Sequence, residues 1–135
     1  MGGPGAIRGP HVYWVLFASA LVVTVLAVAG ADPVRGERVF QRCYACHSVV
    51  TGEDKLPGPN LRGVIGRRAG TLPGFRFSPA MLDAGARGLV WTRQTLDDYL
   101  ADPERALPGS EMSMPGLTSA EDRRDVIDYL EGAGR

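Results

Sequence analysis

The chain has 135 residues, which is a common length for a single domain. Its 15 basic and 15 acidic residues balance, so its charge gives no indication of binding to nucleic acid. Both cysteines and one of the two histidines lie in one pentapeptide. The sequence therefore predicts one domain whose chemistry is concentrated in a short segment.

Residues 1–31 are predicted to be a signal peptide or an uncleaved transmembrane anchor, followed by a domain at 32–135. The uncharged run at residues 12–31 is long enough to cross a bilayer as a helix. It also ends in small residues, Ala29-Gly30-Ala31, that suit cleavage. We favour cleavage, because the first helix of the domain is expected to begin directly after the leader and leaves almost no linker. The length of the apolar run favours the anchor.

The first helix of the domain leads into the pentapeptide. Asp32 and Pro33 suit an N-cap and a first turn, and the helix is predicted to run to about Cys43. The pentapeptide Cys43-Tyr44-Ala45-Cys46-His47 has the Cys-x-x-Cys-His spacing of covalent c-type haem attachment. Two thiols one turn apart can bond the two haem vinyl groups, and the adjacent imidazole is then placed to ligate the iron.

Two other kinds of site also use a Cys-x-x-Cys pair. A thioredoxin-like redox pair is expected after a strand, and no strand pattern precedes this one. A zinc site needs two further ligands, but no cysteine remains and the other histidine, His11, lies in the leader. Both alternatives are therefore disfavoured against covalent haem.

Short helices and loops rich in glycine and proline make up the rest of the chain. No segment alternates as a strand, so the domain is predicted to be all-α, with its loops wrapped around a large group. Further helices are expected from Ser78-Pro79 to Gly85, from Thr92 to Asp102-Pro103, and from a capping box at Thr118-Ser119-Ala120-Glu121 to Gly132.

An electron-transfer haem needs a second axial ligand, which keeps the iron six-coordinate, and methionine raises the reduction potential. Met81 lies in a predicted helix and is assigned to packing. Met112 and Met114 lie in a loop far enough downstream to close over the opposite haem face. Composition alone leaves both of them open as the ligand.

Residues 36–130 resemble class I cytochrome c of the mitochondrial type, as it is found in bacteria. The matching segments follow one another in the order of that family, and together they are specific. They are Gly-Glu-Arg-Val-Phe at 36–40, Gly-Pro-Asn-Leu at 58–61, Gly-Arg-Arg-Ala-Gly at 66–70, Pro-Gly-Phe at 73–75, Trp91, Thr95-Leu96, Tyr99-Leu100, Pro-Gly-Ser-Glu-Met at 108–112 and Glu-Asp-Arg-Arg-Asp-Val-Ile-Asp-Tyr-Leu at 121–130.

The resemblance implies a small cytochrome c fold around one haem c. The haem is attached through Cys43 and Cys46, and its iron is ligated by His47 and Met112. Met112 matches the methionine of the family's Pro-Gly-Thr-Lys-Met motif. Met114 stays an alternative, because many small cytochromes ligate iron through a Met-Pro pair.

The resemblance also implies roles for residues around the haem. The Pro59 carbonyl accepts a hydrogen bond from His47 and thereby sets its tautomer. Arg67 and Trp91 bind the haem propionates, and Tyr99 bonds the methionine sulfur. The contact between the first and last helices is assigned to Gly36, Phe40 and Tyr129, whose roles are structural.

By resemblance, the protein is a periplasmic electron carrier and not an enzyme. It is expected to be a monomer without a small-molecule substrate. Its donor is a quinol-oxidising cytochrome bc complex, and its acceptor is a terminal oxidase or a photosynthetic reaction centre. The alternative is a cytochrome c subunit of a larger respiratory or photosynthetic complex, associated with the membrane through residues 12–31.

The family usually docks through a ring of lysines around the haem edge, and this ring is weakened here. The matching positions include Glu104, Arg105 and Glu111. We therefore expect a partner surface that is mixed or apolar, or a membrane attachment that makes electrostatic steering less necessary. Residues 34–93 carry 10 basic and 4 acidic residues, whereas residues 94–135 carry 4 basic and 10 acidic residues. This separation of charge predicts a strong dipole.

Overall fold

The computed structural model describes residues 1–3, 5 and 32–135. The signal peptide or anchor expected at residues 1–31 therefore lies almost wholly outside the described residues and stays a prediction. In the described part of the chain, no helix has the length and apolar character needed to cross a membrane.

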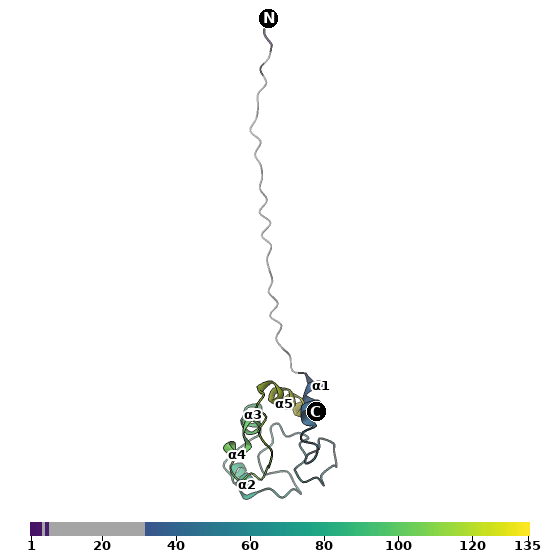
Figure 1. Ribbon diagram of the computed structural model, residues 1–135, viewed down its shortest axis with the longest axis vertical. Coiled ribbons are helices and arrows are strands. Elements are labelled where there is room, and N and C mark those ends of the chain that lie inside the picture. The colour runs from purple at the N-terminus through teal and green to yellow at the C-terminus, as the bar shows by residue number, and fades with distance from the viewer. Residues whose placement is uncertain (4, 6–31) are drawn as a thin grey trace.

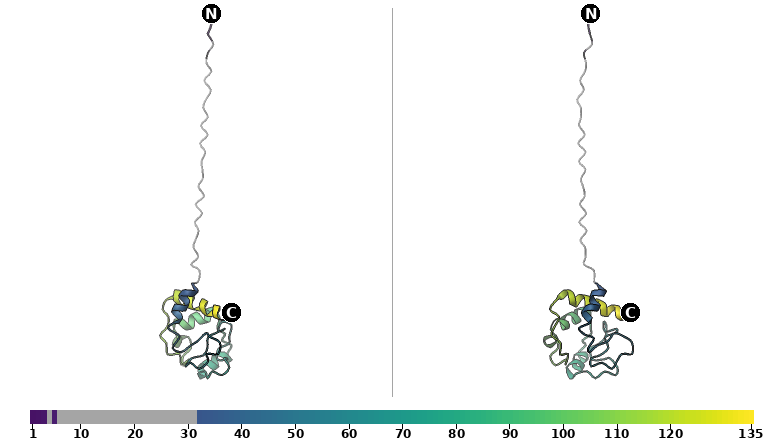
Figure 2. Two further views of the ribbon diagram at one scale, coloured as in Figure 1. Left: turned by 90° about the vertical axis from the view of Figure 1, so that its right-hand side faces the viewer. Right: turned by 45° about the vertical axis from the view of Figure 1, so that its right-hand side comes forward.

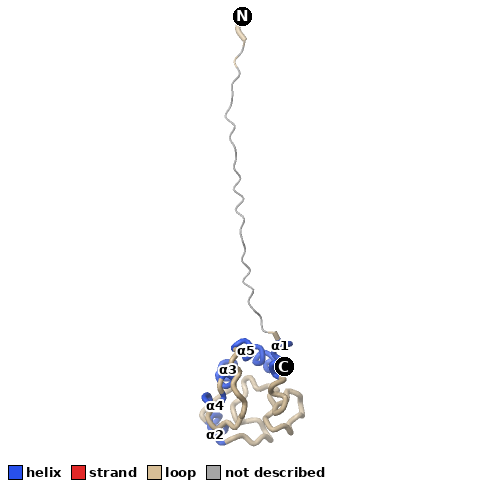
Figure 3. Tube along the Cα trace, in the orientation of Figure 1, coloured by secondary structure: helices blue, strands red, loops and turns tan. Residues whose placement is uncertain are grey.

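Five helices and their connecting loops form the described domain, and Figure 3 shows helix and loop but no strand over residues 32–135. In Figure 1, α1 and α5 lie at one end, α3, α4 and α2 follow along one side, and the loops after α1 lie on the other. Figure 2 keeps α1 and α5 together at the same end in two further views. The all-α prediction is confirmed. The helices are α1 (Pro33–Phe40), α2 (Pro79–Ala86), α3 (Arg93–Ala101), α4 (Pro103–Ala106) and α5 (Ala120–Ala133).

Side-chain caps determine where the first three helices begin. Asp32 caps α1, and its carboxylate accepts hydrogen bonds from two backbone N–H groups of the first turn. Ser78 caps α2 through its hydroxyl, and Thr92 caps α3 in a reciprocal capping box with Thr95. These starts agree with the sequence expectations.

Several helix boundaries differ from those expectations, and α2 ends at Ala86 and not at Gly85. The first helix ends at Phe40 and not near Cys43, because the following turns tighten and the Cys43 N–H bonds the Phe40 carbonyl only three residues back, at 2.7 Å. The last helix is capped by Ser119 and not by Thr118. The Ser119 hydroxyl accepts from the Asp122 N–H at 3.1 Å, so the cap is shifted by one residue.

The sequence analysis also missed α4. Asp102 and Pro103 end α3 as expected, but the same aspartate then caps a further short helix by accepting from the Arg105 N–H at 3.1 Å. Proline at its first position needs no hydrogen-bond partner for its nitrogen, so the pair that stops one helix can start another. The α5 helix also runs one residue further than expected, to Ala133.

The crossing of α1 and α5 depends on a glycine and two aromatic rings. Gly36 is buried at the crossing, where an added Cβ would overlap the Asp125 carbonyl oxygen and lie 2.8 Å from the Tyr129 Cβ. Phe40 is fully buried, and its ring centroid lies 5.3 Å from that of Tyr129. This contact between the first and last helices matches the expectation from sequence.

Ion pairs reinforce the same crossing. Arg35 on α1 contacts Glu121, Asp122 at 3.2 Å and Asp125 at 3.1 Å, all on α5. Asp125 is only 2% exposed, so its pairing compensates a buried charge. Arg93 pairs with two further carboxylates of α5. Two basic residues of the segment 34–93 thus meet acidic residues of the segment 94–135, and these pairs offset part of the charge separation along the sequence.

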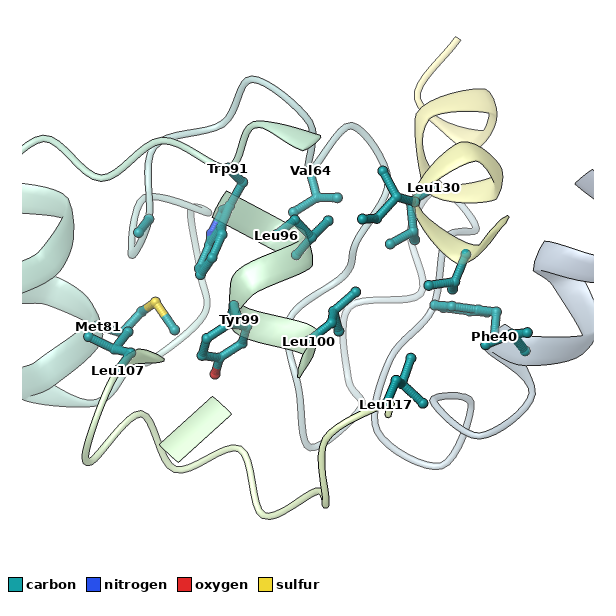
Figure 4. Packing of buried hydrophobic residues seen from close by; sticks show 14 of the residues in the cluster. Phe40, Val64, Met81, Trp91, Leu96, Tyr99, Leu100, Leu107, Leu117 and Leu130 are labelled. Carbon is teal, nitrogen blue, oxygen red and sulfur yellow. The ribbon is translucent and has the colours of Figure 1, made fainter. Parts of the chain in front are cut away.

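The apolar core runs from the α1–α5 crossing to α2, as Figure 4 shows. Phe40 and Leu130 lie at one end of the drawn cluster, and Met81 and Leu107 lie at the other. Leu96, Tyr99 and Leu100 of α3 occupy the middle. Met81 is 8% exposed within this cluster, which confirms its assignment to packing.

Candidate functional site

The pentapeptide forms a tight turn after α1 that presents two free thiols. The N–H groups of Cys46 and His47 both bond the Cys43 carbonyl, at 3.0 and 2.9 Å. Cys43 is partly buried and Cys46 is exposed. Burial raises the pKa of the Cys43 thiol, and the nearby Arg42 partly opposes this rise. The turn therefore holds the two cysteines and the histidine within one short, hydrogen-bonded segment.

His47 is held in one tautomer by the backbone. Its Nδ1 lies 2.7 Å from the Pro59 carbonyl oxygen, and because a carbonyl only accepts, Nδ1 carries the proton and donates. Burial lowers the pKa of His47, although this hydrogen bond acts in the opposite direction. Gly58 packs against the ring, where an added Cβ would lie 2.5 Å from Cε1. The result is a neutral imidazole whose Nε2 is available as a ligand.

Arg67 and Trp91 lie far apart in sequence but are paired through their backbones. The Trp91 N–H bonds the Arg67 carbonyl at 2.9 Å, and the Gly66 N–H bonds the Trp91 carbonyl at 2.8 Å. An antiparallel bridge between Arg68 and Val90 lies between them. The two residues expected to bind haem propionates are thus brought together by backbone pairing.

The Arg67 guanidinium also joins this pair to the histidine loop. Its Nη1 donates to the Asn60 carbonyl at 3.0 Å, and its Nη2 donates to the Arg62 carbonyl. Burial lowers the pKa of Arg67. Two of the five N–H groups of Arg67 thus donate to backbone carbonyls, and the other three take no part in these two hydrogen bonds.

Tyr99 connects the tryptophan to the loop that carries the methionines. Its ring centroid lies 5.0 Å from that of Trp91, and its hydroxyl donates to the Ser110 hydroxyl at 2.9 Å. A phenol has one proton, and in this structure that proton is used in the bond to Ser110. The bond from Tyr99 to the methionine sulfur, which the resemblance implies, stays a prediction. Sequence reasoning missed Ser110, because its contact with Tyr99 depends on the fold of the loop.

The methionine loop runs from residue 108 to residue 117 and is pinned to α3. The Leu117 N–H bonds the Leu100 carbonyl at 2.8 Å. Met112 and Met114 are both half-buried, and both line a hollow of about 340 Å³ between this loop and the start of α4. Glu111, beside Met112, has a positive φ of 64°, which is uncommon for a residue with a side chain. The loop is thus held in a specific conformation around its two methionines.

These residues fit a covalently bound haem. Two reduced cysteines, a neutral imidazole with Nε2 available and two half-buried thioethers supply the attachment and ligand chemistry that such a group needs. A continuous series of contacts also links His47 to Tyr99, through Pro59 and its neighbour Asn60 and then through Arg67 and Trp91. Over the described residues, no group of three or more His, Cys, Asp or Glu is arranged to hold a metal ion, so the zinc alternative gains no further ligands there.

Comparisons with known proteins also indicate a protein that binds haem covalently. The sequence profile of the cytochrome c family matches residues 33–133. Cytochrome c2 of Agrobacterium tumefaciens is 43% identical over 99 residues, which cover 73% of this chain and 89% of that protein. Cytochrome c2 of Rhodomicrobium vannielii is 42% identical over 115 residues, which cover 85% of this chain and 90% of that protein.

Solved structures agree. The structure of cytochrome c2 from Rhodospirillum centenum matches with a TM-score of 0.70 and 38% identity, over 77% of this chain and 99% of that one. Cytochrome cH from Methylobacterium extorquens matches with a TM-score of 0.68 and 37% identity, over 75% of this chain and 98% of that one. The chain therefore belongs to the cytochrome c family, whose members are electron carriers that hold a covalent haem c and are not enzymes.

Proposed function

We propose that this protein is a periplasmic electron carrier with one haem c attached through Cys43 and Cys46. Its iron is ligated by His47 and Met112 and cycles between the ferrous and ferric states. The hydrogen bond from His47 to Pro59 supports this most directly, because it leaves Nε2 of a neutral imidazole for the iron.

The chain's own residues have binding and positioning tasks in this proposal. When bound, the haem supplies the one-electron couple. Two permanent ligands leave little to rearrange when an electron moves, so no acid, base or nucleophile is required. Arg67 and Trp91 bind the propionates, and the bond from Tyr99 to Ser110 holds the methionine loop on α3.

The fate of the leader decides whether the carrier diffuses. Asp32 already caps α1, so a retained anchor ending at Ala31 would leave no flexible linker. A protein held this way could not swing between partners, which favours cleavage and a soluble periplasmic carrier. The alternative remains a membrane-anchored subunit of a larger complex, in which a short connection is an advantage.

The intact mass of the native protein tests both parts of the proposal. A mass equal to residues 32–135 plus one haem is expected for a cleaved carrier. A mass that includes residues 1–31 would favour the anchored subunit. A mass without haem, or a preparation without a reversible one-electron couple, would contradict the proposed function itself.

The proposed donor is a quinol-oxidising cytochrome bc complex, and the proposed acceptor is a terminal oxidase or a photosynthetic reaction centre. The relatives named cytochrome c2 support a redox protein partner. Reduction by one purified complex and oxidation by another, each at a rate that saturates with cytochrome concentration, would identify the pair. Failure with all three classes would contradict this assignment.

Removing the haem is expected to leave the chain largely unfolded. Loops make up most of residues 41–78 and 107–119, and burial of a flat apolar macrocycle would add to the small core between the helices. Far-UV circular dichroism of the apo-protein should show loss of helix and no cooperative thermal transition. The holo-protein under the same conditions is the control, and a native-like cooperative melt of the apo-protein would contradict the prediction.

Electron transfer with an acidic partner is expected to depend only weakly on salt. Glu104 and Glu111 are exposed near the methionine loop and offset nearby basic charge, so electrostatic steering toward an acidic surface is small. The second-order rate should fall by less than about tenfold between ionic strengths of about 0.01 M and about 0.15 M. Stopped-flow measurements against an acidic redox protein would provide these rates.

A charge-reversal pair provides the matched control for this prediction. The double variant Glu104→Lys/Glu111→Lys should steepen the salt dependence, because it places two positive charges beside the methionine loop. Asp54→Lys/Asp83→Lys changes the net charge equally at exposed positions elsewhere and should steepen it less. A steep loss of rate already in the unmodified protein would show that the weakened basic ring does not limit steering.

A further inference from the structure

The carbonyl that orients His47 lies within a short backbone ladder. The Gly58 N–H bonds the Cys46 carbonyl at 2.8 Å, and the Leu61 N–H bonds the Ser48 carbonyl at 2.8 Å. These two bonds flank the bond from His47 to Pro59. The position of the Pro59 carbonyl therefore depends on how firmly the segment 57–61 is held against the segment 46–48.

Asn60 holds that segment from inside the loop. It follows Pro59 directly and is only 6% exposed. Its Nδ2 donates to the Val50 carbonyl at 2.7 Å and to the Glu53 carbonyl at 3.2 Å, and its Oδ1 accepts from the Arg62 N–H at 2.9 Å. Two carbonyls on one side and an N–H on the other define the orientation of the amide, and both of its donors are used.

We propose that Asn60 is a positioning residue that maintains the hydrogen bond from His47 to Pro59 and through it lowers the reduction potential of the haem. The proposal rests on the proposed function. An imidazole whose second N–H is donated to a carbonyl is a more basic ligand and favours the ferric state. Loosening the loop lengthens this bond and shifts the couple toward the ferrous state.

The experiment compares holo-proteins in which either Asn60 or Ser119, the N-cap residue of α5, is replaced. Asn60→Ala is expected to raise the reduction potential and to make hydrogen exchange of the His47 Nδ1 proton at least tenfold faster, measured by NMR in the diamagnetic ferrous state. Asn60→Ser keeps a small polar side chain and should shift both values in the same direction by less. Ser119→Ala removes the α5 cap and should lower stability without moving either value.

The unmodified protein gives a readout that does not depend on how well a variant folds. The Asn60 Nδ2 protons and the His47 Nδ1 proton should become exchangeable with the same opening of the loop, so their protection should change together as denaturant is added. Independent protection would overturn the proposal. The proposal also fails if Asn60→Ala or Asn60→Ser lowers stability but leaves the potential and the His47 exchange unchanged. A protein that lacks covalent haem would instead contradict the proposed function.

Discussion

Replacement of Met112 by alanine is expected to abolish the visible methionine-to-iron charge-transfer band of the ferric protein and to lower its reduction potential. Loss of a thioether ligand removes the group that favours the ferrous state. We expect the potential to fall by more than about 59 mV, which is a tenfold change in a one-electron equilibrium. Visible absorption of the oxidised protein and a redox titration measure the two effects.

Met114→Ala is the matched control, because Met114 lies in the same loop, is half-buried to a similar degree and lines the same hollow. It is expected to keep the charge-transfer band, because the proposed function assigns the iron ligand to Met112. The opposite pattern, with the band lost in Met114→Ala and kept in Met112→Ala, would assign the iron ligand to Met114 and its Met-Pro pair.

Gly36→Ala is expected to destabilise the protein by about 3 kcal/mol. The new Cβ would overlap the Asp125 carbonyl oxygen at the crossing of α1 and α5, where backbone and not a flexible side chain is in the way. The midpoint of thermal unfolding should fall by more than about 10 °C. Thermal melts of the oxidised holo-protein followed by circular dichroism measure it.

A second helical glycine controls for the substitution itself. Gly132 lies in α5, where an added Cβ would meet only the end of the Arg135 side chain, at 3.7 Å. Gly132→Ala should therefore stabilise the helix by roughly 0.5 to 1 kcal/mol or leave it unchanged. Equal losses in both variants would indicate that the α1–α5 crossing adjusts, and would contradict the assigned role of Gly36.

Local chemistry made the helix starts predictable from sequence. Asp32, Ser78 and Thr92 each cap the helix that follows, because a short polar side chain before a helical run can bond only nearby N–H groups. The same reasoning misplaced the cap of α5 by one residue, because Thr118 and Ser119 have similar hydroxyls and only the path of the preceding loop decides between them.

Long-range placement within the site was less predictable. The Cys-x-x-Cys-His spacing is local and pointed directly to haem. The bond from Tyr99 to Ser110 instead depends on how the methionine loop folds back onto α3, and no local pattern encodes it. The four hydrogen bonds that Asn60 makes through its side chain and its carbonyl likewise depend on the closure of a loop that begins ten residues earlier.

The backbone pairing of Arg67 with Trp91 has a consequence for how this chain tolerates changes in length. Residues 70–88, which include α2, form a loop whose base is closed, because the Ala69 N–H bonds the Leu89 carbonyl at 2.9 Å. At Gly88, an added side-chain atom would meet no neighbour within 4 Å. Residues inserted there would enlarge this loop while its base stays closed. The exposed turn after α2 thus offers a place for peptide tags or spectroscopic labels.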